Sequence, residues 1–365
     1  MRVLVVNAGS STMKLSTVED GRLLRADTLV LGPAPPDDAI AARMEDHPAA
    51  DAVGHRIVHG GTAFTAPVVM DPGVRRRLDE LVDLAPLHLP SSLAAYDLAA
   101  RLLPDLPHVA CFDTAFHAGL DPCVSTYAIP VEWRRRWTLR RFGFHGLSHA
   151  WASRRAADML GRSPLGFRVV TCHLGSGASA AAVADGSSVD TTMGFTPMEG
   201  LVMSTRSGSV DPGLVLWLQE HVGLPPGELA ASLEHRSGLL GLAGTSDMAA
   251  VLAAEGGGDP DATLAVAVYL HRLRGAIAAM AAAMGGLDAL AFTGGVGEHA
   301  PTLRWRAAQG LEFLGIALDD RSNSVAEPDA DVSAPGAAVH TLVIASREDA
   351  QIAEDVTRLL ERAPT

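Results

Sequence analysis

The stretch VLVVNAGSSTMKL, residues 3 to 15, decides the fold of the N-terminal part of the chain. Val3 to Val6 form an apolar run typical of a buried strand, and Gly9 permits a chain reversal. The residues up to Asp20-Gly21 can then return as a second strand, so the simplest interpretation is a β-hairpin. A hairpin turn, however, needs fewer polar residues than the carboxamide, three hydroxyls and lysine found between Asn7 and Lys14.

These polar residues suit a phosphate group. Backbone N–H groups of a glycine-containing turn form a concave anion site, hydroxyls add neutral donors, and a lysine adds a positive charge. The spacing is not that of a Walker loop, because G-x-x-x-x-G-K-[ST] is absent. A hairpin and a phosphate site are compatible, and this stretch alone does not decide whether the turn binds phosphate.

Composition excludes several classes of protein. At 365 residues the chain predicts two domains of ordinary size, and its formal net charge of −13 argues against nucleic acid and anionic membrane surfaces as partners. The cysteines show no C-x-x-C spacing and indicate neither a disulfide framework nor a thiolate metal site; they are Cys111, Cys123 and Cys172. The N-terminal apolar run is too short for a signal peptide. We therefore expect a cytoplasmic location.

Apolar runs followed by glycine-rich turns recur three times, at VLVVNAGSS, VVTCHLGSGAS and ALAFTGGVGEH. Helical stretches at 149–160 and 261–284 separate them, which is an α/β pattern. The second helix has Asp259 as its expected N-cap and continues into a buried strand. Residues 32–38 and 325–336 are rich in Pro and Asp and predict surface loops. The recurring units suggest related halves, each contributing a phosphate-facing turn.

Two arginines lie among small or apolar residues, Arg56 in GHRIVHGG and Arg206 in MSTRSGSVDPG. An arginine in such surroundings needs a partner, which is either a buried carboxylate or a bound anion. Asp113 ends an apolar strand and can orient a reacting group or cap a helix. Glu348 begins the final helix, where acidic residues are also favoured by the helix dipole.

His145 and His149 have the H-x-x-x-H spacing that can place two zinc ligands on one helical face. The glutamate of H-E-x-x-H is absent and Gly146 weakens a helix there, so zinc is disfavoured. His145 is better interpreted as a donor aimed at a developing charge.

Nine stretches, in order, resemble motifs of the acetate kinase family, within the superfamily of acetate and sugar kinases, heat-shock-cognate ATPases and actin. They are NAGSSTMK, GHRIVHGG, LAPLHLP, FDTAFH, RFGFHGLSH, HLGSGAS, DTTMGFTPMEGLVMSTRSGSVDPG, SGLLGLAGTSDM and FTGGVGEH. The resemblance implies an α/β fold of two actin-like (ribonuclease H-like) domains with a nucleotide-binding cleft between them. Residues 1–115 plus 350–365 would form the N-terminal domain, and residues 116–349 the C-terminal domain for nucleotide binding and dimerisation.

The resemblance also implies the reaction: reversible, magnesium-dependent, direct in-line transfer from ATP to acetate, giving acetyl phosphate and ADP, by a homodimer. Arg56 and Arg206 would hold the acetate carboxylate and the transferring phosphoryl group, and His145 would stabilise the transition state. Asp113 would orient or polarise the attacking carboxylate. Asn7 would lie near Mg²⁺ and Glu348 would position it through water. Since acetate is already ionised at neutral pH, catalysis has to neutralise an anion attacking an anion.

The remaining implied contacts fall into three groups. The acetate methyl would meet Val58, Leu87, Phe144 and Pro197. Phosphates would meet Ser10, Thr12 and Lys14. The adenine side would involve His173, Leu174, Gly175, Ser176, Gly177, Asp247, Met248, Ala249, Gly295, Val296, Gly297, Glu298 and His299.

The sequence departs from the family pattern at five positions: Leu89, Ser176, Ala249, His299 and Arg347. Two of these changes remove polar groups from the nucleotide side. Alternatives to an acetate kinase are a propionate or butyrate kinase of the same family and a non-enzymatic, actin-like nucleotide-binding module. The module would need neither Arg56 nor Arg206.

Overall fold

The computed structural model describes residues 1–9, 12–30, 37–85 and 89–362. The chain divides into two compact units. Unit 1 comprises Met1–Ala118, Phe144–Trp151 and Arg347–Thr365, and unit 2 comprises Gly119–Gly143 and Ala152–Ser346. The domain boundaries expected from the sequence remain a prediction.

Unit 1 is built on a six-stranded sheet with the order β3-β2-β1-β4-β6-β5. Strands β1, β2 and β3 pair antiparallel, β1, β4 and β6 pair parallel, and β5 pairs antiparallel with β6. The hairpin expected around Gly9 is confirmed, since Asn7 pairs with Lys14. The strand bounds are β1 Arg2–Ala8, β2 Thr12–Glu19, β3 Arg22–Val30, β4 Ala52–Ile57, β5 Val68–Val69 and β6 His108–Phe112.

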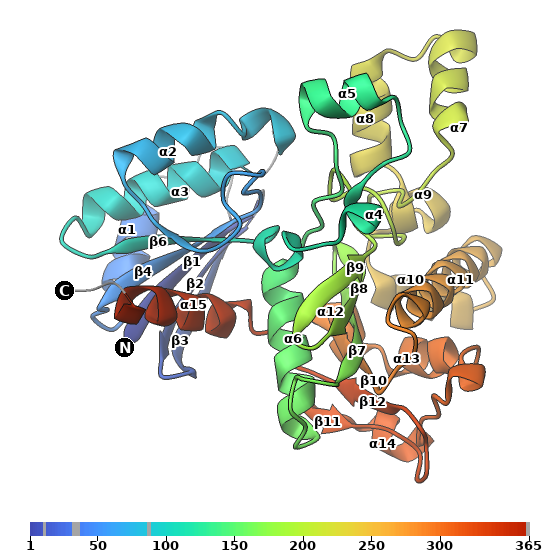
Figure 1. Ribbon diagram of the computed structural model, residues 1–365. Coiled ribbons are helices and arrows are strands. Elements are labelled where there is room, and N and C mark those ends of the chain that lie inside the picture. The colour runs from blue at the N-terminus through green and yellow to red at the C-terminus, as the bar shows by residue number, and fades with distance from the viewer. Residues whose placement is uncertain (10–11, 31–36, 86–88, 363–365) are drawn as a thin grey trace. The chain divides into compact units, whose positions relative to one another are not determined.

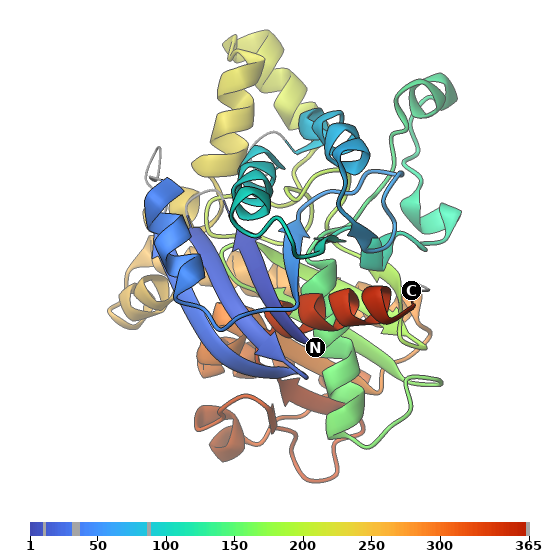
Figure 2. The ribbon, with the colours of Figure 1, turned by 90° about the vertical axis from the view of Figure 1, so that its left-hand side faces the viewer.

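Helices cover both faces of this sheet, as Figures 1 and 2 show. Because side chains alternate along a strand, β1 packs Leu4 and Val6 against helix α3 and turns Val3 and Val5 toward helix α15. The helical elements of unit 1 are α1 Asp37–Glu45, α2 Pro72–Asp79, η1 Val82–Leu84, α3 Leu89–Leu102, η2 Ala115–His117 and α15 Glu348–Arg362. The result is an α/β/α sandwich.

Unit 2 has a second six-stranded sheet, with the order β11-β12-β10-β7-β8-β9. Read from β9, it repeats the first sheet: an antiparallel β9-β8-β7 meander, a parallel β7-β10-β12 row and a short antiparallel edge strand. The related halves suggested by the sequence are thus present in the topology. The bounds are β7 Arg168–Leu174, β8 Ala178–Ala184, β9 Ser187–Thr191, β10 Ala289–Thr293, β11 Ala330–Asp331 and β12 His340–Val343.

Helix α11, Pro260–Ala283, confirms the expected N-cap, because the Asp259 carboxylate accepts a hydrogen bond from the Ala262 N–H at 2.8 Å. It is the one unbroken helix of the described chain long and apolar enough to cross a membrane. It packs against strands β7, β8 and β9 of unit 2.

Helix α6, Gly146–Met159, gives its first six residues to unit 1 and the rest to unit 2. The other helical elements of unit 2 are α4 Pro122–Ser125, α5 Val131–Trp137, α7 Pro212–Trp217, η3 Leu218–Val222, α8 Pro226–His235, α9 Gly238–Ala243, α10 Met248–Gly256, α12 Gly294–His299, α13 Pro301–Ala308, η4 Glu312–Leu314 and α14 Asp320–Ser324.

Two local expectations need correction. The third glycine-rich stretch is the short helix α12 rather than an open turn. The expected loop at 325–336 contains the edge strand β11. The expected loop at 32–38 lies mostly outside the described residues.

Candidate active site

Three neighbouring parallel strands of unit 1 end in polar side chains. Along β1, β4 and β6 the residues that face α15 are Val3, Val5, Ala52, Gly54, Val109 and Cys111. Every second residue of a strand lies on the same face, so the next residues on this face are Asn7, Arg56 and Asp113. They gather at the carboxyl edge of the parallel strands, which is where open α/β sheets bind ligands. Helix α15 begins at Glu348 over the same face.

Arg56 is held by oxygen atoms on three sides. Its Nε and Nη2 donate to the two carboxylate oxygens of Asp113 at 3.1 and 2.5 Å. Its Nη1 donates to Asn7 Oδ1 at 3.2 Å, and Glu348 Oε2 lies 3.8 Å from Nε. The partner that the sequence left open is therefore a buried carboxylate, because Asp113 is 1% exposed. A guanidinium has five N–H donors, so two remain for another acceptor, and the Arg56 side chain is 16% exposed.

The electrostatics keep Arg56 charged. Burial opposes the charge, but the carboxylates of Asp113 and Glu348 outweigh it and raise the pKa of Arg56 above its ordinary value. Burial raises the pKa of the Asp113 carboxyl, whereas the Arg56 guanidinium favours its charged form. Arg56 brings one positive charge and the two carboxylates bring two negative charges. The cluster alone is thus not a strong anion site.

Asn7 joins the two ends of this cluster. Its Oδ1 accepts from Arg56, and its Nδ2 donates to Glu348 Oε2 at 3.0 Å. Glu348 is the first residue of α15, so the expected helix-terminus position is confirmed. It also takes part in the cluster.

Asp113 does not act as a helix cap. Thr114 is the N-cap residue of the following 3₁₀ helix, and that end has no side-chain cap hydrogen bond. Thr114 Oγ1 instead accepts from the Gly60 N–H at 3.0 Å. The capping interpretation of Asp113 is therefore wrong: its carboxylate pairs with Arg56, and its role in orienting a reacting group stays a prediction.

His145 lies beside this cluster in a strained conformation. Its φ is +56°, in the left-handed region that a residue with a side chain rarely adopts. The Gly146 N–H donates to the Asp113 carbonyl at 2.9 Å, and a Cβ on Gly146 would lie 2.2 Å from that oxygen. His117 Nε2 lies 3.1 Å from the Phe144 carbonyl. The chain on both sides of His145 is therefore fixed, a role for His117 and Gly146 that the sequence analysis missed.

The zinc alternative loses its geometric basis. His145 precedes helix α6 instead of belonging to it, so His145 and His149 are not two positions on one helical face. Within the described ranges, no group of three or more His, Cys, Asp or Glu side chains could hold a metal ion.

The remaining predicted residues of unit 1 lie around the same strand ends. Val58 and Phe144 are buried, and the Phe144 ring contacts the His59 ring edge-to-face at 5.4 Å. Lys14 is exposed and Thr12 half-buried, and both share the hairpin face of Asn7. Ser10 and Leu87 fall outside the described residues.

In unit 2 the predicted nucleotide residues lie at the equivalent strand ends. His173 on β7 pairs in register with Thr293 on β10, and α12 starts at the next residue, Gly294. Gly294 has φ +78°, and a Cβ there would lie 2.8 Å from the Leu174 carbonyl oxygen, so only glycine lets the two chains approach so closely. Gly295 is exposed and has open space where a side chain would be.

The turn between β7 and β8 is closed by a hydrogen bond from the Gly175 N–H to the Gly177 carbonyl at 3.0 Å, which leaves Ser176 exposed. Asp247 and Ala249 are exposed and Met248 is buried. The Asp247 carboxylate caps helix α10 by accepting from the Ala249 N–H at 3.0 Å.

Arg206 and Pro197 also belong to unit 2, and both are half-buried. Arg206 Nη1 donates to the Pro197 carbonyl at 3.2 Å. The structure therefore brings Asn7, Arg56, Asp113, His145 and Glu348 together in unit 1. Arg206 is beside Pro197 in unit 2.

The chain is similar to known proteins over nearly its whole length. The model of the acetokinase family matches residues 38–354. An acetate kinase from Leifsonia xyli subsp. xyli is 44% identical over 390 residues, with 96% of this chain and 97% of that protein covered. The chain belongs to the acetokinase family.

Solved structures agree as well. The crystal structure of Porphyromonas gingivalis acetate kinase matches with a TM-score of 0.91 at 35% identity, covering 98% of this chain and 99% of the other. A propionate kinase from Francisella tularensis subsp. tularensis matches with a TM-score of 0.90 at 32% identity, covering 97% and 98%. The family resemblance, the actin-like α/β fold and the expectation of a kinase are confirmed.

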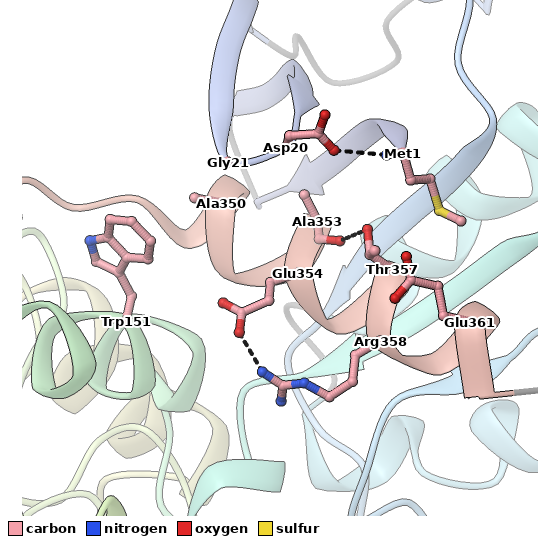
Figure 3. Close-up of a pocket in the computed structure, with 10 residues that line it drawn as sticks. All are labelled: Met1, Asp20, Gly21, Trp151, Ala350, Ala353, Glu354, Thr357, Arg358 and Glu361. Atoms are coloured by element: carbon pink, nitrogen blue, oxygen red, sulfur yellow. Dashed lines mark hydrogen bonds and ion pairs between the residues drawn. The ribbon is translucent and has the colours of Figure 1, made fainter. Parts of the chain in front are cut away.

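A pocket of about 420 Å³ elsewhere in unit 1 contains none of the predicted site residues. It lies along α15 beside Trp151 and the N-terminus, as Figure 3 shows. Met1 pairs with Asp20 at 2.9 Å, and Arg358 pairs with Glu354. We assign no ligand to it.

Proposed function

We propose that the protein catalyses reversible, magnesium-dependent phosphoryl transfer from ATP to acetate, giving acetyl phosphate and ADP. The observation that carries the proposal is the cluster of Arg56, Asp113, Asn7 and Glu348 at the carboxyl ends of three parallel strands, in a chain of this family. An acetate oxygen forms a bond to the γ-phosphorus while the bond to the β,γ-bridging oxygen breaks, and that electron pair leaves with ADP. This is direct in-line transfer.

The side chains have separate tasks in this reaction. Asp113 holds two N–H groups of Arg56, and this fixes the direction of the free donors toward the acetate carboxylate. Arg206 and His145 would add charge and a hydrogen bond at the transferring phosphoryl group, where charge develops on the equatorial oxygens. Val58, Leu87, Phe144 and Pro197 would receive the acetate methyl. Because acetate needs no deprotonation, no side chain acts as a strong base.

The residues fit a magnesium ion. Mg²⁺ prefers oxygen ligands, retains several waters and commonly binds through one or two carboxylates plus substrate phosphates. Glu348 offers a carboxylate that is 17% exposed, and Asn7 holds it at 3.0 Å. A divalent cation at Glu348 would change the cluster from net negative to net positive, and this supplies the anion attraction that Arg56 alone lacks.

The nucleotide is proposed to bind at two places. Ser10, Thr12 and Lys14 would meet its phosphates. The adenine side would contact the end of β7 with the turn that follows it (173–177), the start of α10 (247–249) and helix α12 (295–299). Glycine-rich backbone next to a helix start provides N–H groups at short range for such a ligand.

A hydroxylamine trap for acyl phosphates tests the proposal. Purified protein is incubated with Mg²⁺ and each pairing of acetate, propionate, butyrate or formate with ATP, GTP or pyrophosphate. We expect acetate with ATP to give the highest kcat/KM. Equal or higher kcat/KM values with propionate or butyrate would support a propionate or butyrate kinase; the similar Francisella tularensis protein is named a propionate kinase. No acyl phosphate with any pairing would favour a nucleotide-binding module.

The proposal includes a cytoplasmic homodimer. Unit 2 exposes large apolar side chains on α5 and α7, where a soluble monomer would seldom place so many: Val131, Trp133, Trp137, Leu214, Leu216 and Trp217. A second copy of this chain is the occupant we propose. Light scattering after size exclusion should give twice the 38.0 kDa chain mass. A 38.0 kDa species would contradict it.

A further inference from the structure

Arg304 is an arginine buried without a carboxylate. It lies on helix α13, is 1% exposed and has the largest of the fully buried side chains. Its Nη1 donates to the carbonyls of Gly297 and Glu298, both at 2.8 Å. Its Nε and Nη2 donate to the side-chain and backbone oxygens of Asn323, both at 2.9 Å. Along the described part of the chain, no acidic side chain pairs with it.

Such a residue is a poor choice for stability alone. Burying a charge is costly, and well-packed apolar residues commonly stabilise a protein as much as a buried ion pair does. Burial lowers the pKa of Arg304 to about 10, so it remains a cation at neutral pH. A buried cation whose hydrogen bonds all go to neutral oxygens suggests that its function is geometric.

The geometry concerns helix α12. This helix is short, and the carbonyls at its end lack partners within the helix. Arg304 binds two of those carbonyls, while Gly294 fixes the start of the helix against Leu174. Glu298 adds another anchor, because its Oε1 accepts from the Ser346 N–H at 2.9 Å. Gly295 remains exposed between these anchors.

Asn323 extends the support by one step. It is 2% exposed, and its Nδ2 donates to the Pro301 carbonyl at 2.9 Å, at the first residue of α13. Arg304 and Asn323 therefore connect α12, α13 and α14 through neutral oxygens alone.

We propose that Arg304 is a positioning residue for the nucleotide. It holds α12 by its C-terminal carbonyls, so that the exposed Gly295 near the start of the helix keeps one orientation toward ADP or ATP. The inference rests on the proposed assignment of Gly295–His299 to the nucleotide side. Arg304 itself would not touch the ligand.

The test compares Arg304→Lys and Arg304→Met with a matched control, Arg306→Met. Arg306 lies on the same helix and pairs with Glu255 at 2.7 Å, away from α12. ADP affinity is measured by calorimetry, and KM is measured separately for ATP and acetate. The single ammonium of a lysine cannot reach all four acceptors, and a methionine donates to none of them. Both Arg304 variants should therefore raise the ADP Kd and the ATP KM about tenfold or more. The acetate KM should stay within twofold, and Arg306→Met should match the wild type.

Asn323→Ala keeps the proposal falsifiable if Arg304→Met fails to fold, since it removes one acceptor and leaves the arginine. It should raise the ADP Kd by a smaller factor than Arg304→Lys. An unchanged ADP Kd in folded Arg304→Lys, or an equal rise in acetate KM, would overturn the positioning role. If the wild type forms no acetyl phosphate while its ADP Kd still depends on Arg304, the proposed activity fails and the positioning role stands.

Discussion

Arg56 and Val58 lie two residues apart, and their environments suggest different tasks. Arg56 is half-buried with two uncommitted N–H groups, whereas Val58 is 6% exposed and apolar. Acetate has a carboxylate and a methyl group, so its site needs a cation next to an apolar surface. The identity of the acyl substrate should therefore depend on Val58 more than on any charged residue.

The first prediction concerns acyl specificity. One methylene in an apolar pocket is worth about 1–3 kcal/mol, so acetate should exceed propionate in kcat/KM by roughly ten- to two-hundred-fold. Val58→Ala should narrow this gap, mainly by improving propionate. Val109→Ala, a fully buried valine on β6, is the control and should leave the ratio unchanged. If the wild type uses both acids equally well, or Val58→Ala impairs both alike, Val58 is only core packing.

The second prediction concerns Glu348. Glu348→Gln should raise the Mg²⁺ concentration required for half-maximal rate and lower kcat, because an amide is a weaker ligand for a hard cation than a carboxylate. A helix-terminus role alone would cost about 0.3–1 kcal/mol of stability and leave the magnesium dependence intact. Glu354→Gln, on the same helix, is the matched control. Identical magnesium titrations for the two variants would exclude Glu348 from the metal site.

At the scale of elements, the contact between β4 and α15 sets the position of Glu348. Gly54 on β4 lies under α15, where a Cβ would come within 2.5 Å of Ile352 Cγ2 and 3.0 Å of Val356 Cγ2. The helix is thereby close enough for its first residue to reach Asn7. A glycine in a central strand has a clear structural reason here.

The third prediction follows from this contact. Gly54→Ala should destabilise the protein by about 1–3 kcal/mol through overpacking, and it should also raise the Mg²⁺ concentration required for half-maximal rate, because α15 carries Glu348. Gly227→Ala on α8 is the control, because a Cβ at Gly227 would have no neighbouring atom within 4 Å. Urea unfolding of the two variants measures the difference. Equal midpoints would mean that α15 adjusts without cost.

The fourth prediction concerns the buried histidine pair on β4 and β6. His55 Nε2 and His108 Nδ1 lie 2.9 Å apart, and burial lowers the pKa of His55 to about 3. The pKa of His55 is therefore lower in the folded protein than in the unfolded chain. On acidification the unfolded state takes up the proton first. The contribution of neutral His55 to the free energy of unfolding is complete above about pH 6.5. It falls on acidification toward pH 3 by about 1.4 kcal/mol per pH unit.

Urea unfolding between pH 7 and pH 5 tests this pH dependence. His55→Gln should flatten the slope, and His271→Gln, an exposed residue on α11, should keep the wild-type slope. A His55→Gln slope equal to that of the wild type would show that the pair does not control acid stability.

Across the whole chain, features set by neighbouring residues could be predicted from the sequence, whereas contacts between residues far apart in the sequence could not. The N-terminal hairpin, the capped helix α11 and the strand before Asp113 follow from local periodicity and capping residues. The bond between Asn7 and Glu348 spans 341 positions and follows from strand order, which a single sequence does not contain. Arg304 lacked a signal, because nothing local distinguishes a buried arginine in the helical sequence LRWRA, residues 303–307, from an exposed one.

The topology explains why the three glycine-rich stretches have different environments. Two of them follow equivalent central strands, β1 and β7, and begin antiparallel meanders. The third follows β10, the strand equivalent to β4, and begins a helix. Similar sequence patterns thus occupy different topological positions, and periodicity alone predicted a turn for all three.

The proposed function requires the Arg56 cluster to support transfer of a phosphoryl group to acetate. The measurement that tests it most directly is the rate of acetyl phosphate formation by Arg56→Ala, with Arg206→Ala beside it and Arg75→Ala as a control arginine paired to Asp97. Loss of a preorganised charge-stabilising donor costs about two to three powers of ten in kcat, so Arg56→Ala and Arg206→Ala should each fall by at least about a hundredfold while remaining folded. Arg75→Ala should retain the wild-type rate. A near-normal rate for folded Arg56→Ala would contradict the proposed role of the Arg56 cluster.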